Sequence, residues 1–182
     1  MESLQSSLEI NWWKEIQGHS LAQGDYLEGC PIPILPEDFD PIAGVDTEFT
    51  IEKHNIIILS HSCDLANTKV RFVVVCPVYT LQQIKAALPA QYSKLSSWEP
   101  VRRGQVEGWH MISGFSGSRD NTASLIVDFK QVHTLPLGFL NKFAGNFETR
   151  SRLISPYVER LSQSFARFFM RIGLSCEILP FK

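Results

Sequence analysis

The chain has 182 residues, of which 44% are hydrophobic and 20% charged, and its formal net charge is −2. This length fits one domain, and the composition is that of a globular protein rather than a disordered one. The small negative charge excludes a global electrostatic attraction to nucleic acid or anionic lipid. A nucleic-acid partner would therefore need a local basic patch.

The sequence carries no sign of a membrane or a secretory route. No apolar stretch approaches the roughly 20 residues that span a bilayer, and the opening MESLQSSLEINWWKE lacks a basic-then-apolar signal pattern. We therefore expect a cytoplasmic protein with no membrane partner. The cysteines are scattered without a CxxC pair, so most are expected to be buried thiols rather than disulfides. They are Cys30, Cys63, Cys76 and Cys176.

The first predicted element is a helix within residues 1–20. Leu8, Trp12 and Ile16 recur at intervals of four residues, which places them on one apolar stripe of a helix. Gly18 follows as the expected stop.

A β-rich core with insertions is predicted over residues 24–140. Its clearest strand is Ile56–Ser60, an apolar run typical of a strand buried on both faces. Cys30–Pro41 holds four prolines and predicts an irregular loop, because proline donates no ladder hydrogen bond. Pro77 is expected at the end of its strand or on an edge. Further strands are expected at Glu48–Ile51, Phe72–Val78, Trp109–Ile112 and Ser124–Leu135, with a short helix at Leu81–Leu88.

The last predicted element is an amphipathic helix over residues 155–173. Apolar residues share one arc at about 100° per residue, and arginines share the opposite side. Ser155 is the expected cap and Gly173 the expected terminator. The apolar positions are Val158, Leu161, Phe165, Phe168, Phe169 and Ile172, and the basic ones are Arg160, Arg167 and Arg171.

Three sequence signatures follow one another in a recognisable order. After a Gly24-Asp25 start, Ile56–Ser60 forms an apolar strand ending in Ser, and Val73–Thr80 contains a strand ending in Thr. Ser124–Leu135 then carries Gln-Val-His-Thr. This order resembles the MazF/PemK toxin family, whose corresponding signatures end in Ser, in Pro-Ile-Thr and in Gln-Ile-Arg-Thr. The resemblance implies an α+β domain with a small SH3-like β-barrel of the MazF/PemK/CcdB type, flanked here by N-terminal and C-terminal helices.

The resemblance also implies positions for ribonuclease chemistry. The family's ribonucleases place an Arg just before the first buried strand and a Thr or Ser just after the second. Here Lys53 and His54 stand at the first position and Thr80 at the second. Lys53 would hold phosphate without the bidentate grip of an arginine. His54 is available as a general acid or base, and Thr80 would position the scissile group.

A second candidate site is the polar turn after the Ile56–Ser60 strand. His61, Cys63 and Asp64 supply a base, a thiol and a carboxylate within four positions. Three interpretations stay open. Cys63 can be a nucleophile with a histidine as its base, or the turn can hold zinc with a further ligand. In the third, Ser62 or Asp64 caps a helical turn and Cys63 is buried.

The leading hypothesis is an RNA-directed endoribonuclease-like module of a bacterial toxin, conflict or stress system, and no cofactor is implied. Its candidate catalytic residues are Lys53, His54, His61, Cys63, Asp64 and Thr80. One alternative is a non-catalytic interaction module whose added helices dock a protein partner or a second copy; exposure of Phe165, Phe168 and Phe169 would favour it. The other alternative is a thiol- or zinc-dependent enzyme at the turn.

Overall fold

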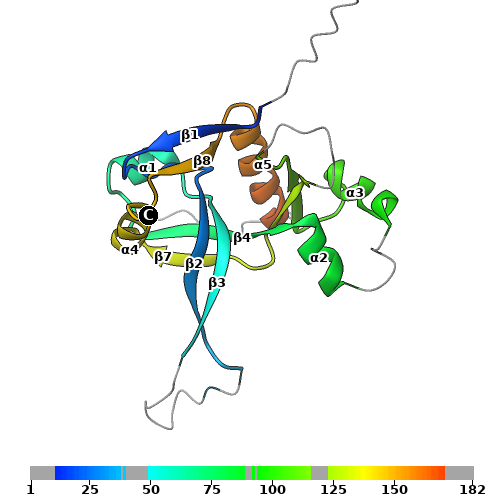
Figure 1. The fold of residues 1–182 in the computed structure, drawn as a ribbon, viewed down its shortest axis with the longest axis horizontal. Coiled ribbons are helices and arrows are strands. Elements are labelled where there is room, and N and C mark those ends of the chain that lie inside the picture. The colour runs from blue at the N-terminus through cyan, green and yellow to red at the C-terminus, as the bar shows by residue number, and fades with distance from the viewer. Residues whose placement is uncertain are drawn as a thin grey trace, which may run out of the picture.

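The computed structural model describes residues 11–37, 39, 49–88, 92, 94–115 and 123–170. They form an α+β fold dominated by antiparallel strands (Figure 1). The strands are β1 (Trp13–Gln17), β2 (Tyr26–Ile34), β3 (Thr50–Ile58), β4 (Phe72–Thr80), β5 (Trp109–Ile112), β6 (Leu125–Asp128), β7 (His133–Pro136) and β8 (Thr149–Leu153). The helices are α1 (Ser62–Ala66), α2 (Leu81–Ala87), the 3₁₀ helix η2 (Leu95–Trp98), α3 (Glu99–Arg102), α4 (Leu137–Ala144) and α5 (Tyr157–Phe169).

The strands form two antiparallel sheets. The larger has the order β2-β3-β4-β6-β5, with β7 also paired to β4, and the smaller is β1-β8. The small sheet touches both ends of the larger one. Arg152 of β8 forms a bridge with Asp25, just before β2, and Trp13 Nε1 donates to the Ser113 carbonyl, just after β5, at 2.9 Å. Strand pairing in the described part of the chain is thus an open path, with no pair that closes it into a barrel.

The centre of the larger sheet is the apolar half of β3. Ile56 and Ile58 belong to one hydrophobic cluster and Ile57 to another, and all three are fully buried. This confirms the prediction of a strand buried on both faces. Each such side chain contributes about 1.5–3 kcal/mol through burial.

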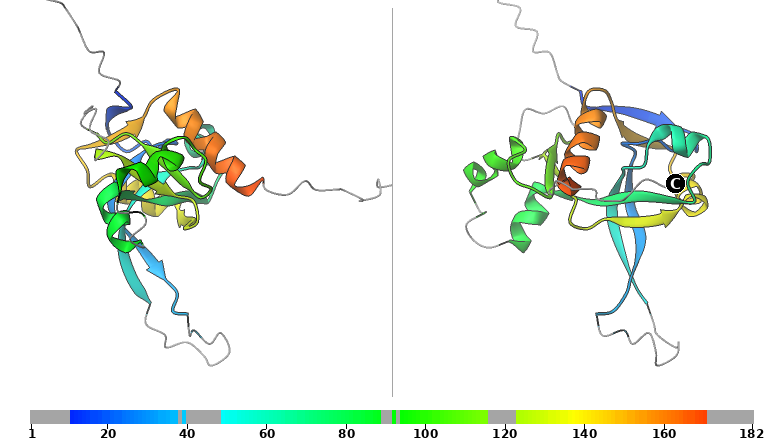
Figure 2. Two further views of the ribbon diagram at one scale, coloured as in Figure 1. Left: turned by 90° about the vertical axis from the view of Figure 1, so that its right-hand side faces the viewer. Right: turned by 180° about the vertical axis from the view of Figure 1, so that it is seen from behind.

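The prediction of an irregular loop at Cys30–Pro41 was wrong for its first part. β2 continues to Ile34, with Pro31 opposite Lys53 and Pro33 opposite Ile51. Because β2 ends the strand order, it pairs over this stretch with β3 alone, and a strand with one neighbour tolerates proline. The outer parts of β2 and β3 project from the body as an arm (Figures 1 and 2).

Pro77 lies inside β4, opposite Ile56, and not at its end or on an edge as predicted. On β4, residues 72–75 pair with β7 and residues 78–80 pair with β6, so Pro77 falls in the gap between the two partners. The missing N–H therefore interrupts no ladder there. The strand predicted over 124–135 was wrong in its continuity, because a turn at residues 129–132 divides it into β6 and β7. The strands at Phe72–Val78 and Trp109–Ile112 and the helix at Leu81–Leu88 are confirmed.

The predicted N-terminal helix was wrong for the residues that are described. Trp13–Gln17 is β1, paired antiparallel with β8, and residues 1–10 lie outside the described part. The two tryptophans explain the difference. Trp12 stacks on Tyr157 at 3.8 Å between ring centroids, whereas Trp13 is buried in the core. Consecutive side chains that pack on opposite faces have the period of a strand.

The C-terminal helix is confirmed as α5, which packs along the body (Figure 2). Pro156 and not Ser155 is its N-cap, and residues 171–173 lie outside the described part. Its own residue Leu161 is fully buried against the body. None of the helices in the described ranges is long and apolar enough to cross a bilayer.

Candidate functional site

Two histidines from different strands meet in the larger sheet, where β3, β4 and β7 come together. We call this group the imidazole cluster; it consists of Glu52, His54, Tyr79, Gln131 and His133. In the β3–β4 register Ile56 lies opposite Pro77, so two residues further out His54 lies beside Tyr79. β7 also pairs with β4, with His133 opposite Val75, and this pairing places His133 next to His54.

The geometry of the cluster centres on His54. Its Nε2 lies 2.9 Å from Glu52 Oε2, and its ring stands nearly perpendicular to that of Tyr79, with 6.4 Å between ring centroids. The ring of His133 lies 6.4 Å away and is inclined by 26°. Tyr79 Oη donates to Gln131 Oε1 at 3.1 Å. A carboxylate thus fixes one imidazole, and an amide fixes the phenol.

The surroundings shift the pKa values of His133 and Tyr79 in opposite directions. Burial lowers the pKa of His133, positive charge at His54 lowers it further, and Glu52 partly opposes this. Burial raises the pKa of Tyr79, as do Asp128 and Glu52, against the hydrogen bond with Gln131. At neutral pH His133 is therefore a neutral proton acceptor, and Tyr79 retains its proton.

These features suit proton transfer. A general base must be neutral and reachable at the working pH, and its partner must be held in a fixed orientation. His133 meets the first condition and His54, fixed by Glu52 with 15% of its side chain exposed, meets the second.

Of the predicted site residues, only His54 belongs to the imidazole cluster. Lys53 is exposed on β3, and strand alternation turns its side chain to the other face from that of His54. Thr80 is the N-cap of α2: its Oγ1 accepts from the Gln83 N–H at 3.1 Å, and the Gln83 side chain accepts from the Thr80 N–H at 2.8 Å. This reciprocal capping box gives Thr80 a structural role at the start of α2.

His61, Cys63 and Asp64 lie together at the start of α1. His61 is its N-cap, and its Nδ1 accepts from the Cys63 N–H at 3.4 Å. Neither Ser62 nor Asp64 makes this cap, and Cys63 is exposed, not buried as expected. His61 lines an open groove of about 710 Å³ together with Arg152 and Glu159, among others.

The α1 turn and the imidazole cluster are separate places. Seven steps of largely extended chain divide His54 from His61, on the order of 20 Å at the strand rise per residue. The described ranges also contain no group of three or more His, Cys, Asp or Glu side chains arranged to hold a metal ion.

The residues that sequence reasoning missed carried a signal. Glu52 and His54 alternate on a strand and therefore share a face. Gln131 and His133 stand in the third signature, Ser124–Leu135, although they are not among the predicted catalytic residues. The end of that signature lies in β7, which pairs with β4 as β3 does, and this shared neighbour brings the groups together.

The added helix α5 is mainly a packing element. Phe165 and Phe168 are half-buried, with ring centroids 5.4 and 6.2 Å from that of Phe129. Phe169 is 60% exposed. Two of the three phenylalanines that would favour a docking helix are therefore engaged by the core.

Comparison of the sequence with models of protein families and with curated proteins finds no match.

Proposed function

We propose that the protein is an RNA-directed endoribonuclease of the MazF/PemK type, built on an SH3-like barrel and acting in a toxin or stress system. The observation that carries this proposal is the placement of His54, held by Glu52 at 2.9 Å, beside His133. Two imidazoles at one place can supply both proton transfers that cleavage of a phosphodiester by its own 2′-hydroxyl requires.

The proposed reaction assigns one transfer to each ring. Neutral His133 takes the proton of the 2′-hydroxyl, and the 2′-oxygen forms a bond to phosphorus while the bond from phosphorus to the 5′-oxygen breaks. Protonated His54, oriented by Glu52 at Nε2, gives its Nδ1 proton to the 5′-oxygen. The products are a 2′,3′-cyclic phosphate and a 5′-hydroxyl. Tyr79, whose hydroxyl proton is donated to Gln131 Oε1, holds a fixed position beside His54.

Two features support the barrel and the substrate class. The small β1–β8 sheet touches both ends of the larger sheet, which is how a barrel would be completed. The order of the signatures from Gly24 to Leu135 is that of the family. Lys53, exposed on the face of β3 opposite to that of His54, would offer a cation to the RNA backbone outside the reacting phosphate.

The test is cleavage of a single-stranded RNA carrying a fluorophore and a quencher by the purified chain, with and without EDTA. His54→Ala and His133→Ala should each lower the rate about 100-fold or more, the usual size of a general acid–base effect. Glu52→Gln should lower it less, because the ring remains. Product ends should be cyclic phosphate and 5′-hydroxyl.

His61→Ala is the matched control, since it removes an exposed histidine at the separate α1 turn. It should leave the rate unchanged. A folded wild-type protein that cleaves no RNA would refute the proposal. Loss of cleavage in His61→Ala with retention in His54→Ala would move the site to the α1 turn.

A further inference from the structure

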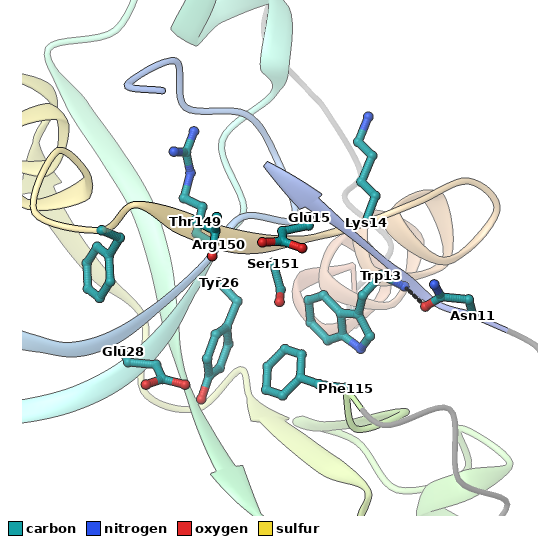
Figure 3. A pocket seen from close by; sticks show the side chains of 11 residues that line it. Asn11, Trp13, Lys14, Glu15, Tyr26, Glu28, Phe115, Thr149, Arg150 and Ser151 are labelled. Atoms are coloured by element: carbon teal, nitrogen blue, oxygen red, sulfur yellow. Dashed lines mark hydrogen bonds between the residues drawn. The ribbon is translucent and has the colours of Figure 1, made fainter. Parts of the chain in front are cut away.

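A pocket of about 440 Å³ lies between β1, β2 and β8, apart from the imidazole cluster (Figure 3). Because side chains alternate along a strand, every second residue of β1 and of β2 can face this pocket. Trp13 and Glu15 are two residues apart on β1, as Tyr26 and Glu28 are on β2, so each pair shares a face. Phe115, which follows β5, completes the aromatic wall. We call these five residues, with the space they line, the aromatic–acidic pocket.

Three aromatic rings form one wall at angles to one another. The ring of Phe115 lies 4.8 Å from that of Trp13 and 4.8 Å from that of Tyr26, inclined by 46° and 61°. The rings of Trp13 and Tyr26 are 6.1 Å apart and meet edge to face. Trp13 and Tyr26 are almost fully buried, whereas Phe115 is 42% exposed. The three rings therefore pack against one another, and the exposed ring of Phe115 is the aromatic surface that an ammonium or guanidinium group can contact.

The rim is acidic. Among the described residues, neither Glu15 nor Glu28 takes part in an ion pair. The two basic residues that also border the space do not neutralise them. In Figure 3 the charged ends of Lys14 and Arg150 point away from it. Arg150 is already engaged, because its Nε lies 3.2 Å from Asp25 Oδ2 and its other nitrogens donate to backbone carbonyls.

The remaining polar groups are uncharged. Burial raises the pKa of Tyr26 to about 12, and Glu28 raises it as well against a hydrogen bond with Asn55. The phenol therefore stays protonated at neutral pH and adds no charge. Ser151, opposite Glu15 in the β1–β8 register, contributes a hydroxyl. The pocket thus combines an aromatic wall with two carboxylates.

We propose that the aromatic–acidic pocket binds an organic cation, a guanidinium or alkylated ammonium group held against the rings and paired with Glu15 and Glu28. A phosphate or carboxylate ligand would meet two negative charges there and is disfavoured. The same cation chemistry is supplied by a free small amine and by an Arg or Lys side chain of a peptide. This site is independent of the proposed RNA cleavage, which uses other residues.

The test is isothermal titration calorimetry of the full chain with tetramethylammonium chloride and with N-acetyl-arginine amide, against sodium chloride at matched ionic strength. Both organic cations should bind and sodium chloride should give no heat of binding. N-acetyl-aspartate amide serves as the anionic control. A short peptide with a central arginine tells the two sources apart: tighter binding than the free arginine derivative indicates a peptide partner, and equal binding indicates a small-molecule ligand.

Three variants locate the binding. Glu28→Gln and Phe115→Ala should each weaken it about tenfold, and neither removes a fully buried side chain. Glu159→Gln, at the separate groove beside α1, is the matched control and should bind as the wild type does. The proposal is overturned if neither cation binds, if the aspartate derivative binds equally well, or if Glu28→Gln and Phe115→Ala leave the affinity unchanged.

Discussion

Arg150 and Asp25 form an ion pair in the interior, with Arg150 Nε 3.2 Å from Asp25 Oδ2 and neither side chain more than 2% exposed. Arg152 adds a second guanidinium, whose Nη2 donates to Asp25 Oδ2 at 2.9 Å. Asp25 also accepts from the Ala22 N–H at 3.1 Å, and Arg150 donates to the Gly18 carbonyl. The network therefore fastens the segment between β1 and β2 to β8.

We expect Asp25→Ala to destabilise the fold by about 3–5 kcal/mol, because it leaves a buried guanidinium without its counter-ion. Urea unfolding followed by circular dichroism measures this. Glu99→Ala is the control: Glu99 pairs with Arg102 and Arg103 at the surface, and its loss should not move the unfolding midpoint. A loss below about 1 kcal/mol for Asp25→Ala would show that the pair is not fully desolvated.

His110 gives the fold a dependence on pH. Burial lowers its pKa to about 4, with the positive charge of Arg160 contributing, and its Nε2 has no hydrogen-bond partner among the described residues. The unfolded chain takes up this proton near pH 6.5, before the folded one does. Stability is therefore full above pH 6.5 and falls between about pH 6.5 and 4, by on the order of 3 kcal/mol.

His110→Phe should flatten this slope and keep the stacking on Phe129, whose ring centroid lies 6.0 Å away. The measurement is the free energy of unfolding at pH 4.5 and 7. A smaller slope should persist from His133, whose pKa is lowered too. His61→Ala, at an exposed position, should keep the wild-type slope, and an unchanged slope in His110→Phe would contradict the assignment.

The strands could be predicted where burial alone decides the structure. Ile56, Ile57 and Ile58 are apolar on both faces, and a short run of β-branched residues favours a buried strand over a helix. The predictions at the prolines were wrong because the effect of a proline depends on which strands pair with its own strand. Pro31 is tolerated by the single pairing of β2, and Pro77 by a change of partner along β4, neither of which is written in the local sequence.

The site was harder to predict than the fold, since its groups come from strands far apart in the chain. His54 and His133 are separated by 79 positions (133 − 54) and meet through pairing with β4. The His61-Cys63-Asp64 turn was predicted as a site because its groups are neighbours in sequence. Closeness in sequence places them on one helical turn, where His61 serves as a cap.

The cysteines should differ in reactivity. Cys63 is exposed, whereas burial raises the pKa of Cys30 and of Cys76 to about 12. In a Cys176→Ser background, one thiol should react with a disulfide reagent in the folded state, and the other two only after denaturation. Peptide mapping by mass spectrometry identifies the site. Cys63→Ser should abolish the fast reaction and leave RNA cleavage intact; a loss of cleavage would favour the thiol enzyme at the turn.

Two substitutions at Thr80 can distinguish a helix-capping role of this residue from a catalytic one. Thr80→Ala removes the side-chain half of the capping box of α2 and should cost roughly 0.5–2 kcal/mol of stability. Thr80→Asn supplies another N-cap oxygen without a hydroxyl, so it should recover most of that stability. RNA cleavage, measured well below the melting temperature of both variants, should equal that of the wild type. If Thr80→Asn is as stable as the wild type but cleaves at least tenfold more slowly, the hydroxyl positions the scissile group, as the family resemblance implies, and the cap is secondary.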